Sequence, residues 1–204
     1  TFFLDSGLDI IKKFFPGATT DQIEEIRCQM VSALPEANPY TFLSSMGSVI
    51  SSWIAHLLGF AGPAVVLDEG AVSGIQALQE AMDDLLLKRS DIAMAGALQP
   101  PLTKAFLQGF SGSFRFSHEE AVRPFCRDSE GTLPGEGAAF FVLKRLKDAI
   151  RQGDRIYAII RSTGISAAAI DQHQRIPTPE RLERAISRAL HNAECSPDSV
   201  QLIE

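Results

Sequence analysis

The sequence predicts an α/β fold with a mixed parallel and antiparallel sheet. Residues 64–67 and 91–96 are short apolar runs typical of buried strands. Residues 73–88, between them, predict a helix whose inner face is Ile75, Leu78, Met82 and Leu85 or Leu86. A strand, a tight turn, a helix and a second strand form a βαβ unit, so the sheet is expected to be at least partly parallel.

Composition and charge are those of an ordinary globular protein. Of 204 residues, 45% are hydrophobic and 22% charged, which excludes a disordered or low-complexity chain. The net charge of −6 comes without a basic stripe, so we expect no nucleic-acid partner. No apolar run reaches the roughly 20 residues that span a bilayer and no signal peptide is visible, so no membrane partner is expected. The three cysteines form no CxxC pair, which favours a reduced, cytoplasmic setting: Cys28, Cys126 and Cys195.

Helices dominate the first sixty residues. Ser6 is expected to cap a helix over residues 7–15 that Pro16 ends. Thr19 and Gln22 form a capping-box pattern at the start of a second helix, which is expected to pack through Cys28 and one apolar face: Ile23, Ile26, Met30 and Leu34. Residues 39–42 are interpreted as a loop and residues 47–58 as a buried helix.

Strands and helices are also expected after residue 96. Residues 99–137 are interpreted as a long irregular segment of the kind that covers a site. Strands are predicted over residues 138–144, 156–161 and 200–203, and a helix over residues 146–152. Thr178 and Pro179 open a last helix with Leu182, Ile186 and Leu190 on its inner face.

The turn over residues 68–74 is where a nucleophile would be expected. Open α/β sheets place sites at the carboxyl ends of strands, and a helix N-terminus stabilises a thiolate or oxyanion there. Ser73 comes one place too late for a G-x-S-x-G elbow, so we interpret it as a residue of the helix N-terminus rather than a nucleophile. Gly135-Glu-Gly137 is not expected to bind a dinucleotide, because it lacks the third glycine and the following helix of the dinucleotide-binding motif.

No metal or cofactor is expected. The four histidines show no metal-ligand spacing and are interpreted as surface or singly bonded rings: His56, His118, His173 and His191. Cys126 is interpreted as a small loop residue, with a reactive thiol as the alternative. Asp128, Glu130 and Glu136 flank a glycine-rich loop and favour turn stabilisation over cation binding.

Several motifs together resemble the β-ketoacyl synthase (ketosynthase) family, which has a thiolase-like fold. Arg123-Pro-Phe-Cys-Arg-Asp-Ser-Glu-Gly131 resembles the family's R-P-F-D-x-D-x-D-G. Residues 135–146 resemble its G-E-G-A-x-x-x-V-L-K-R-L, and residues 153–161 its G-D-x-I-Y-A-V-I-R strand. Residues 91–96 resemble the strand that follows its nucleophile helix, and residues 1–35 are similar to an insertion in ketosynthases of polyunsaturated fatty acid synthases.

The resemblance implies that this chain carries none of the family's catalytic residues. The family's nucleophile motif is D-T-A-C-S-S, and this sequence aligns on Asp68 as D-E-G-A-V-S, so Ala71 stands at the cysteine position. A methyl group cannot form a thioester. The family's catalytic histidines and lysine lie further on, the first in an E-A-H-G-T-G-T motif of which Glu204 would be the first residue.

The resemblance therefore implies a silent partner of the chain-length-factor kind, which pairs with an active ketosynthase. Such a chain would support decarboxylative Claisen condensation, with an acyl carrier protein delivering acyl and malonyl thioesters. Departures from the family motif also occur at Glu69, Gly70, Val72 and Gly74, which favours natural degeneration over an engineered Cys-to-Ala change. Candidate tunnel and interface residues are Phe42, Met46, Val49, Ile50, Trp53, Val65, Val66 and Leu67, with plain core packing as the alternative.

Two other functions remain open on the sequence. One is a malonyl-carrier-protein decarboxylase, although Ala71 offers no amide to hold an enolate oxygen; the other is a non-condensing docking module of a multienzyme. The family register divides the chain into a helical insertion and interface region (1–60), the later part of the first ketosynthase half (61–152) and the start of the second half (153–204). The first residue is not Met and the last residues resemble a buried strand, so we expect the functional protein to be longer.

Overall fold

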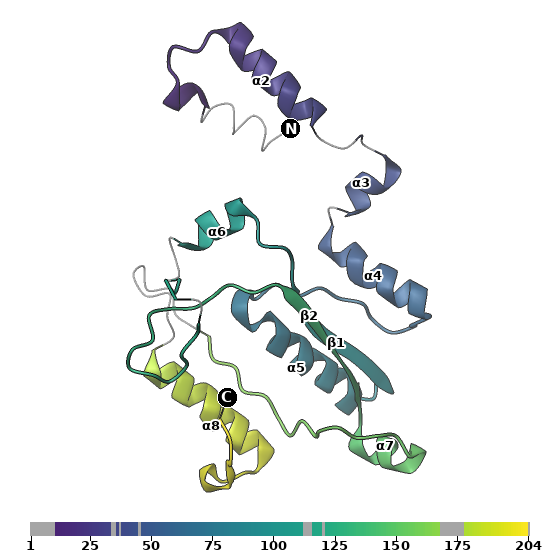
Figure 1. The fold of residues 1–204 in the computed structure, drawn as a ribbon. Helices are drawn as coiled ribbons and strands as arrows, with labels where there is room; N and C mark the ends of the chain where they lie inside the picture. Colours follow the sequence, from purple (N-terminus) through teal and green to yellow (C-terminus); the bar gives the residue numbers. More distant parts are fainter. Residues whose placement is uncertain are drawn as a thin grey trace. The chain divides into compact units, whose positions relative to one another are not determined.

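The computed structural model describes residues 11–33, 36, 38–44, 46–111, 116–119, 121–167 and 178–203. The chain divides into two compact units, Thr1–Val66 and Leu67–Glu204. Figure 1 shows helices in the first unit, and a two-stranded sheet with several helices in the second.

The first unit contains helices α2 (Thr20–Ser32), α3 (Pro39–Ser44) and α4 (Gly47–Leu58). Residues 11–14 are also helical, while residues 7–10 of the helix expected over 7–15 lie outside the described residues. The capping box of α2 is confirmed: the Thr19 hydroxyl accepts from the Gln22 N–H (3.3 Å), and the Gln22 side chain accepts from the Thr19 N–H (2.9 Å). The expectation that Cys28 packs in a core is wrong. Cys28 is exposed, and no residue of α2 is buried.

The expectation of a loop over residues 39–42 is wrong. These residues belong to α3, which begins at Pro39. Asn38 starts the helix, since its side-chain oxygen accepts from the Tyr40 N–H and its own N–H donates to the Thr41 hydroxyl, both at 2.9 Å. Asn followed by Pro at the first helical position is a helix start that the sequence interpretation missed.

Helix α4 matches its expected bounds but is not buried. Gly59 ends it in the left-handed conformation (φ 68°) with its N–H on the Ala55 and His56 carbonyls. No residue of α4 is buried, and Leu57 is 74% exposed. The apolar composition of residues 47–58 predicts a buried helix. Among the described residues, however, no segment covers all faces of α4.

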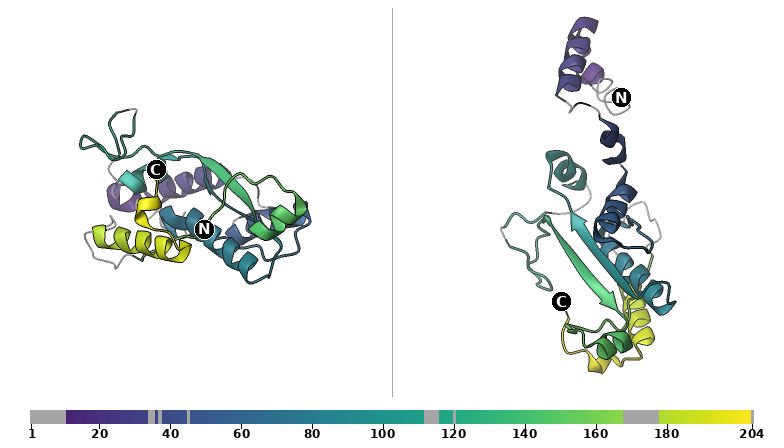
Figure 2. Two further views of the ribbon diagram at one scale, coloured as in Figure 1. Left: turned by 90° about the horizontal axis from the view of Figure 1, so that it is seen from below. Right: turned by 90° about the vertical axis from the view of Figure 1, so that its right-hand side faces the viewer.

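The sheet of the second unit pairs β1 (Ile92–Gln99) with β2 (Gly137–Lys144) in antiparallel register, from Ile92 opposite Lys144 to Gln99 opposite Gly137. Helix α5 (Ser73–Leu86) packs along one face of this sheet (Figures 1 and 2). A Cβ added at Gly74 would lie 3.2 Å from the Ala97 Cβ, so the first turn of α5 sits directly on β1. The predicted strands 91–96 and 138–144 and the predicted helix 73–88 are thus present with small shifts of their ends.

Three other predicted strands are not formed among the described residues. Residues 64–67, 156–161 and 200–203 carry no strand pairing, and the parallel pair expected between 64–67 and 91–96 is absent there. The only parallel pairing described is the single bridge between Phe116 and Thr132. An apolar run becomes a strand only when a neighbour accepts its backbone hydrogen bonds, and local sequence does not supply that neighbour.

Residues 99–137 are less irregular than expected. They include helix α6 (Lys104–Ser111), whose start is fixed by the Thr103 hydroxyl accepting from the Phe106 N–H at 3.1 Å. The rings of Phe106 and Phe110 stack on this helix, 4.2 Å between centroids.

Helices α7 (Leu146–Gln152) and α8 (Pro179–Ala193) agree with the prediction, and a short 3-10 helix, Pro197–Ser199, follows. The predicted inner face of α8 is wrong for Leu182 and Ile186, which are 59% and 50% exposed, whereas Leu190 is half-buried. Alanines make the closest approach instead: Gly164 lies so near this helix that an added Cβ would be 2.0 Å from the Ala185 carbonyl oxygen. Larger side chains there would keep the two segments apart.

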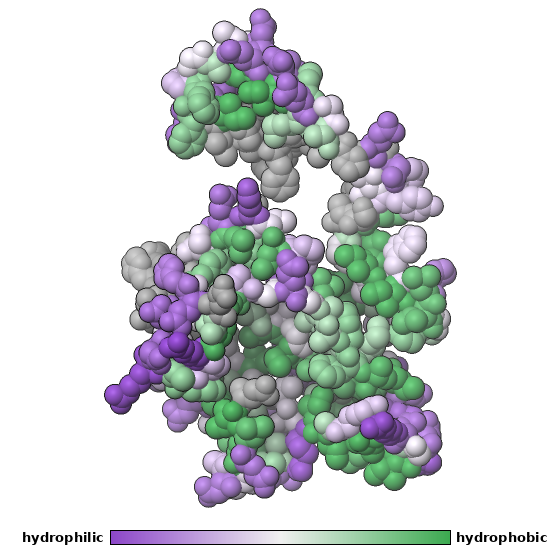
Figure 3. Space-filling model, in the orientation of Figure 1, coloured by the Kyte–Doolittle hydropathy of each residue, from purple (hydrophilic) through white to green (hydrophobic). Residues whose placement is uncertain are grey.

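Few side chains are buried among the described residues. The buried apolar residues are Ala81, Leu85, Ala95, Ala149 and Ala193. Because Ala97 faces α5, the alternation of the strands places Ile92, Leu98, Phe140 and Val142 on the other face of the sheet, all between 48% and 74% exposed. Hydrophobic side chains reach the surface in many places (Figure 3). No described helix is long and apolar enough to cross a bilayer.

Candidate functional site

The turn that leads into α5 forms the candidate site. It contains the short 3-10 helix Gly70–Val72, and Ser73 then begins α5. Ala71 is the middle residue of the 3-10 helix and is exposed. Ala71 is therefore accessible and lies two residues before the first residue of a 14-residue helix.

Hydrogen bonds close this turn on itself. The Ser73 hydroxyl accepts from the Glu69 N–H (2.9 Å) and donates to the Gly70 carbonyl (2.7 Å). The Ser73 N–H also donates to the Gly70 carbonyl, and the Asp68 carboxylate accepts from the Gly70 N–H at 3.3 Å. Gly70 has a φ of 61°, the left-handed region that favours glycine. The sequence interpretation of Ser73 as a residue of the helix N-terminus is confirmed.

The candidate tunnel and interface residues of the first unit lie mainly on α4. Met46 precedes the helix, and Val49, Ile50 and Trp53 follow on it; Val49 is half-buried and the other three are 42–50% exposed. Phe42 belongs to α3, and its side chain lies outside the described ones. The structure adds Tyr40, whose ring meets the Trp53 ring edge to face (6.4 Å, 77°).

Val65, Val66 and Leu67 lie in the connecting segment rather than in a strand. Val65 and Val66 are 63% and 51% exposed, and Leu67 is half-buried. The Val66 side chain lies beside the start of α4, 3.7 Å from where a Cβ on Gly47 would be. Val66 is thus a neighbour of the α4 candidates within the first unit.

Three carboxylates of the 119–136 region, Glu119, Asp128 and Glu136, serve as hydrogen-bond or ion-pair partners. Arg123 bridges Asp128 (2.6 Å) and Glu119 (2.7 Å), and Glu136 accepts from the Leu102 N–H at 2.7 Å. These contacts were not predicted, because each joins residues whose proximity depends on loop geometry. No three His, Cys, Asp or Glu side chains among the described residues cluster closely enough to hold a metal ion.

Phe125 and Cys126 stand out in the same loop. Phe125 has a positive φ of 61° and is 85% exposed, and Cys126 is exposed beside it.

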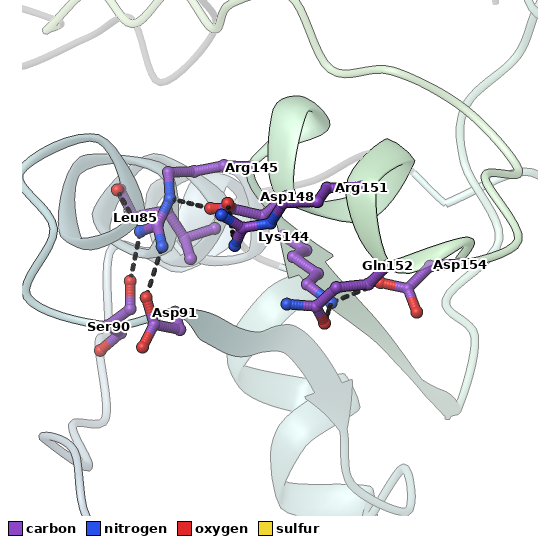
Figure 4. Close-up of polar contacts among 9 residues, drawn as sticks. All are labelled: Leu85, Ser90, Asp91, Lys144, Arg145, Asp148, Arg151, Gln152 and Asp154. Carbon is purple, nitrogen blue, oxygen red and sulfur yellow. Dashed lines mark hydrogen bonds and ion pairs between the residues drawn. The ribbon is translucent and has the colours of Figure 1, made fainter.

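A second polar cluster fixes the far end of α5 (Figure 4). The Arg145 guanidinium donates to the Leu85 carbonyl (2.9 Å), to the Ser90 carbonyl (2.7 Å) and to Asp91. It also donates to Asp148 at 2.6 Å, and this hydrogen bond lowers the pKa of the Asp148 carboxyl below its ordinary value of 3.8. The same bond is the main cause that raises the pKa of Arg145. Arg145 therefore joins α5, β1 and α7.

The sequence pattern of the β-ketoacyl synthase N-terminal domain matches residues 15–149. The match includes Ala71, its turn and both strands of the sheet.

Curated relatives are polyketide synthases. One component of the phenolphthiocerol/phthiocerol polyketide synthase of Mycobacterium tuberculosis is 30% identical over 86% of this chain. The spectinabilin polyketide synthase system protein NorA' of Streptomyces orinoci is 31% identical over 83% of it. The chain spans 11% and 5% of the length of these relatives.

Solved ketosynthases share the fold. The oxazolomycin ketosynthase domain OzmH KS7 of Streptomyces albus JA3453 is 27% identical, with a TM-score of 0.68 over 74% of this chain and 27% of that chain. The ishigamide ketosynthase/chain length factor is 26% identical, with a TM-score of 0.66 over 76% of this chain and 38% of that chain. The chain therefore belongs to the β-ketoacyl synthase family, with a thiolase-like fold of which it forms a part.

Proposed function

We propose that this chain is a catalytically silent ketosynthase-like subunit or domain of a polyketide or polyunsaturated fatty acid synthase. In this role it acts as a chain-length factor, supporting decarboxylative Claisen condensation by an active partner ketosynthase. The observation that carries the proposal is Ala71, which stands where the family has its nucleophilic cysteine. Acyl transfer to the enzyme needs a nucleophile that forms a covalent bond, and a methyl group forms none.

The intact turn around Ala71 supports this role. A turn that had lost its function and its structure together would not keep the Ser73 hydrogen bonds at 2.9 and 2.7 Å or the close seat of Gly74 on Ala97. A silent partner would contribute the shape of the site and no chemistry. It would therefore keep the fold of this turn even though it lacks the nucleophile.

Exposed apolar side chains on α4 supply a surface for such a partner or for the acyl chain. Met46, Ile50 and Trp53 are spaced by four and three residues, so they follow one face of the helix. Helix α4 contains no Asp, Glu, Lys or Arg, and exposed apolar surfaces of this kind mark interaction sites. We expect this face to border the acyl chain or the partner ketosynthase, with an acyl carrier protein delivering acyl and malonyl thioesters.

The test uses the full reading frame that contains residues 1–204, expressed with the active ketosynthase of the same synthase. We expect the two to copurify, and we expect Trp53→Ala to change the length of the polyketide product, measured by mass spectrometry. Ser52→Ala on the same helix is the matched control and should leave product length unchanged. A protein that stays monomeric and leaves the product length of the ketosynthase unchanged would refute the proposal and favour the docking module.

A decarboxylase makes a different prediction. It would release carbon dioxide from malonyl-carrier protein without any partner ketosynthase. We expect release no faster than from malonyl-carrier protein alone, because no side-chain donor extends from Ala71 to hold the enolate oxygen.

A further inference from the structure

We propose that Ser73 is the positioning residue for the backbone at residue 71, and that Gly70 and Ser73 together keep this turn closed. The inference rests on the proposed function in one respect, the assignment of Ala71 to the nucleophile position. It goes further by giving a physical reason for two departures from the family motif, Gly70 and Gly74.

The Ser73 hydroxyl uses both of its hydrogen-bonding capacities within the turn. It accepts from the Glu69 N–H at 2.9 Å and donates to the Gly70 carbonyl at 2.7 Å, so one oxygen atom joins the two residues that precede Ala71. A serine at a helix start commonly accepts from an N–H further along the helix. Ser73 instead bonds backwards, and the residue that precedes α5, Val72, makes no side-chain cap.

Gly70 supplies the conformation that this closure needs. Its φ of 61° is disfavoured for residues with a Cβ, whereas nothing lies within 4 Å of the position where its Cβ would be. The space around Gly70 is therefore open. The turn needs glycine at this position for its backbone conformation and not for lack of room. Alanine, which the family has at this position, would strain the turn as it is built here.

Gly74 fixes the closed turn to the sheet. An added Cβ would lie 3.2 Å from the Ala97 Cβ, so glycine allows the first turn of α5 to rest on β1. Two of the departures from the family motif, Gly70 and Gly74, thus meet a specific demand of the turn. The hydrogen bonds of Ser73 close the turn, and the closed turn fixes the backbone of residue 71 at the N-terminus of α5.

The test places a reporter on the turn. Ala71→Cys introduces a thiol close to the N-terminus of a 14-residue helix, where thiol pKa values are lowered. We expect its pKa to fall below about 7.5, against about 8.5 for a free thiol. The full chain is alkylated with iodoacetamide between pH 5 and 10, and the rate for the peptide that holds residue 71 is followed by mass spectrometry. The native thiols of Cys28, Cys126 and Cys195 are read in the same samples as internal references.

Opening the turn should raise the pKa of this thiol. In the Ala71→Cys background, we expect Ser73→Ala to move the pKa toward about 8.5 and to slow alkylation at pH 7 roughly tenfold. Ser73→Thr keeps a hydroxyl and should retain the rate, and Ser90→Ala, just beyond the other end of α5, is the matched control. A pH profile that is the same with and without the Ser73 hydroxyl overturns the inference.

A second variant covers the case in which Ser73→Ala does not fold, as judged by circular dichroism. Gly70→Ala in the Ala71→Cys background leaves the Ser73 hydroxyl in place but puts a residue with a Cβ at a φ of 61°, which strains the backbone of the turn. We expect the same rise in pKa, and an unchanged pH profile would again contradict the inference. Neither outcome depends on a partner ketosynthase, so failure here is distinct from failure of the proposed function, which is judged on product length with the native Ala71.

Discussion

The Arg145 Nε–H donates to a carboxylate oxygen of Asp148 at 2.6 Å, and the rest of the same guanidinium holds the C-terminal end of α5 and the start of β1 (Figure 4). The side chains of Arg145 and Asp148 are only 21% and 17% exposed. Arg151 adds a further ion pair to Asp148 at 2.8 Å. The cluster joins the start of α7 to the connection between α5 and β1, which lies 55 to 60 residues earlier in the chain, so its loss should destabilise the second unit.

The first prediction concerns pH. Because the pKa of Asp148 is lowered from 3.8 in the folded chain, its charged form contributes stability that is fully present above about pH 4. That contribution is lost as pH falls through the lower, folded-state pKa. We expect Asp148→Asn to lower the unfolding free energy at pH 7, and the difference from the unsubstituted chain to vanish once the pH is well below the folded-state pKa of Asp148.

Urea unfolding at a series of pH values measures this effect. Asp198→Asn, a change of the same chemistry at an exposed carboxylate of the 3-10 helix Pro197–Ser199, is the control. A stability difference between Asp148→Asn and the unsubstituted chain that persists undiminished at pH 2 would show that Asp148 acts through packing instead of charge.

The second prediction concerns the contact of Gly164 with α8. A Cβ at this position would lie 2.0 Å from the Ala185 carbonyl oxygen and 2.8 Å from the Ala189 nitrogen, and neither backbone atom can rotate away. We expect Gly164→Ala to destabilise the second unit by about 1–3 kcal/mol. Gly109→Ala is the control, because nothing lies within 4 Å of its Cβ position on α6. Thermal unfolding followed by circular dichroism should separate the two variants, and equal midpoints would contradict the prediction.

The third prediction concerns the start of α2. Thr19→Ala removes one of the two reciprocal hydrogen bonds of the capping box and should cost about 1 kcal/mol of local helix stability. Hydrogen exchange of the amides in the first turn of α2 should become about fivefold faster, the equivalent of that free energy. Ser32→Ala, at the opposite end of the helix, removes only a bond to the Gln29 carbonyl and serves as the control. Unchanged exchange at Gln22 would mean that the cap does not stabilise this helix.

Elements with local signals could be predicted from the sequence. The capping box of Thr19 and Gln22, the helix α7 and the strand β2 have the expected positions, because capping, apolar spacing and turn residues act over a few neighbours. The strands expected at 64–67, 156–161 and 200–203 depended on partners that the local sequence does not contain, and these residues form no strand pairing among the described residues.

The sequence predicted which turn forms the candidate site, but not the hydrogen bonds and backbone conformation of that turn. The register of residues 68–73 predicts that Ala71 stands at the family's nucleophile position, and this stays a prediction. The double hydrogen bond of Ser73 and the positive φ of Gly70 depend on the path of the backbone, which the motif does not encode. The contact between Tyr40 and Trp53 was missed because the sequence interpretation placed a loop where α3 forms.

The last prediction concerns Gly96 in the centre of β1. Gly96 pairs with Phe140 on β2, and an added Cβ would meet the Phe140 ring at 2.6 Å and the Ala139 carbonyl oxygen at 2.2 Å. The Phe140 ring therefore occupies the space that a side chain at position 96 would need, on the face of the sheet opposite α5. We expect Gly96→Ala to displace this ring and strain the pairing, with a cost of about 1–3 kcal/mol.

Gly135→Ala, two residues before β2 and with nothing within 4 Å, should be nearly neutral by comparison. The two variants are compared by urea unfolding and by hydrogen exchange of the β1 amides. The combination Gly96→Ala with Phe140→Ala relieves only the clash with the ring, because the Ala139 carbonyl oxygen and the Phe140 Cα, 2.8 Å from the added Cβ, stay in place. We expect partial recovery of stability in the double variant, since the Ala139 carbonyl oxygen stays in place. Full recovery would assign the whole cost to the ring, and no recovery would assign it to the backbone.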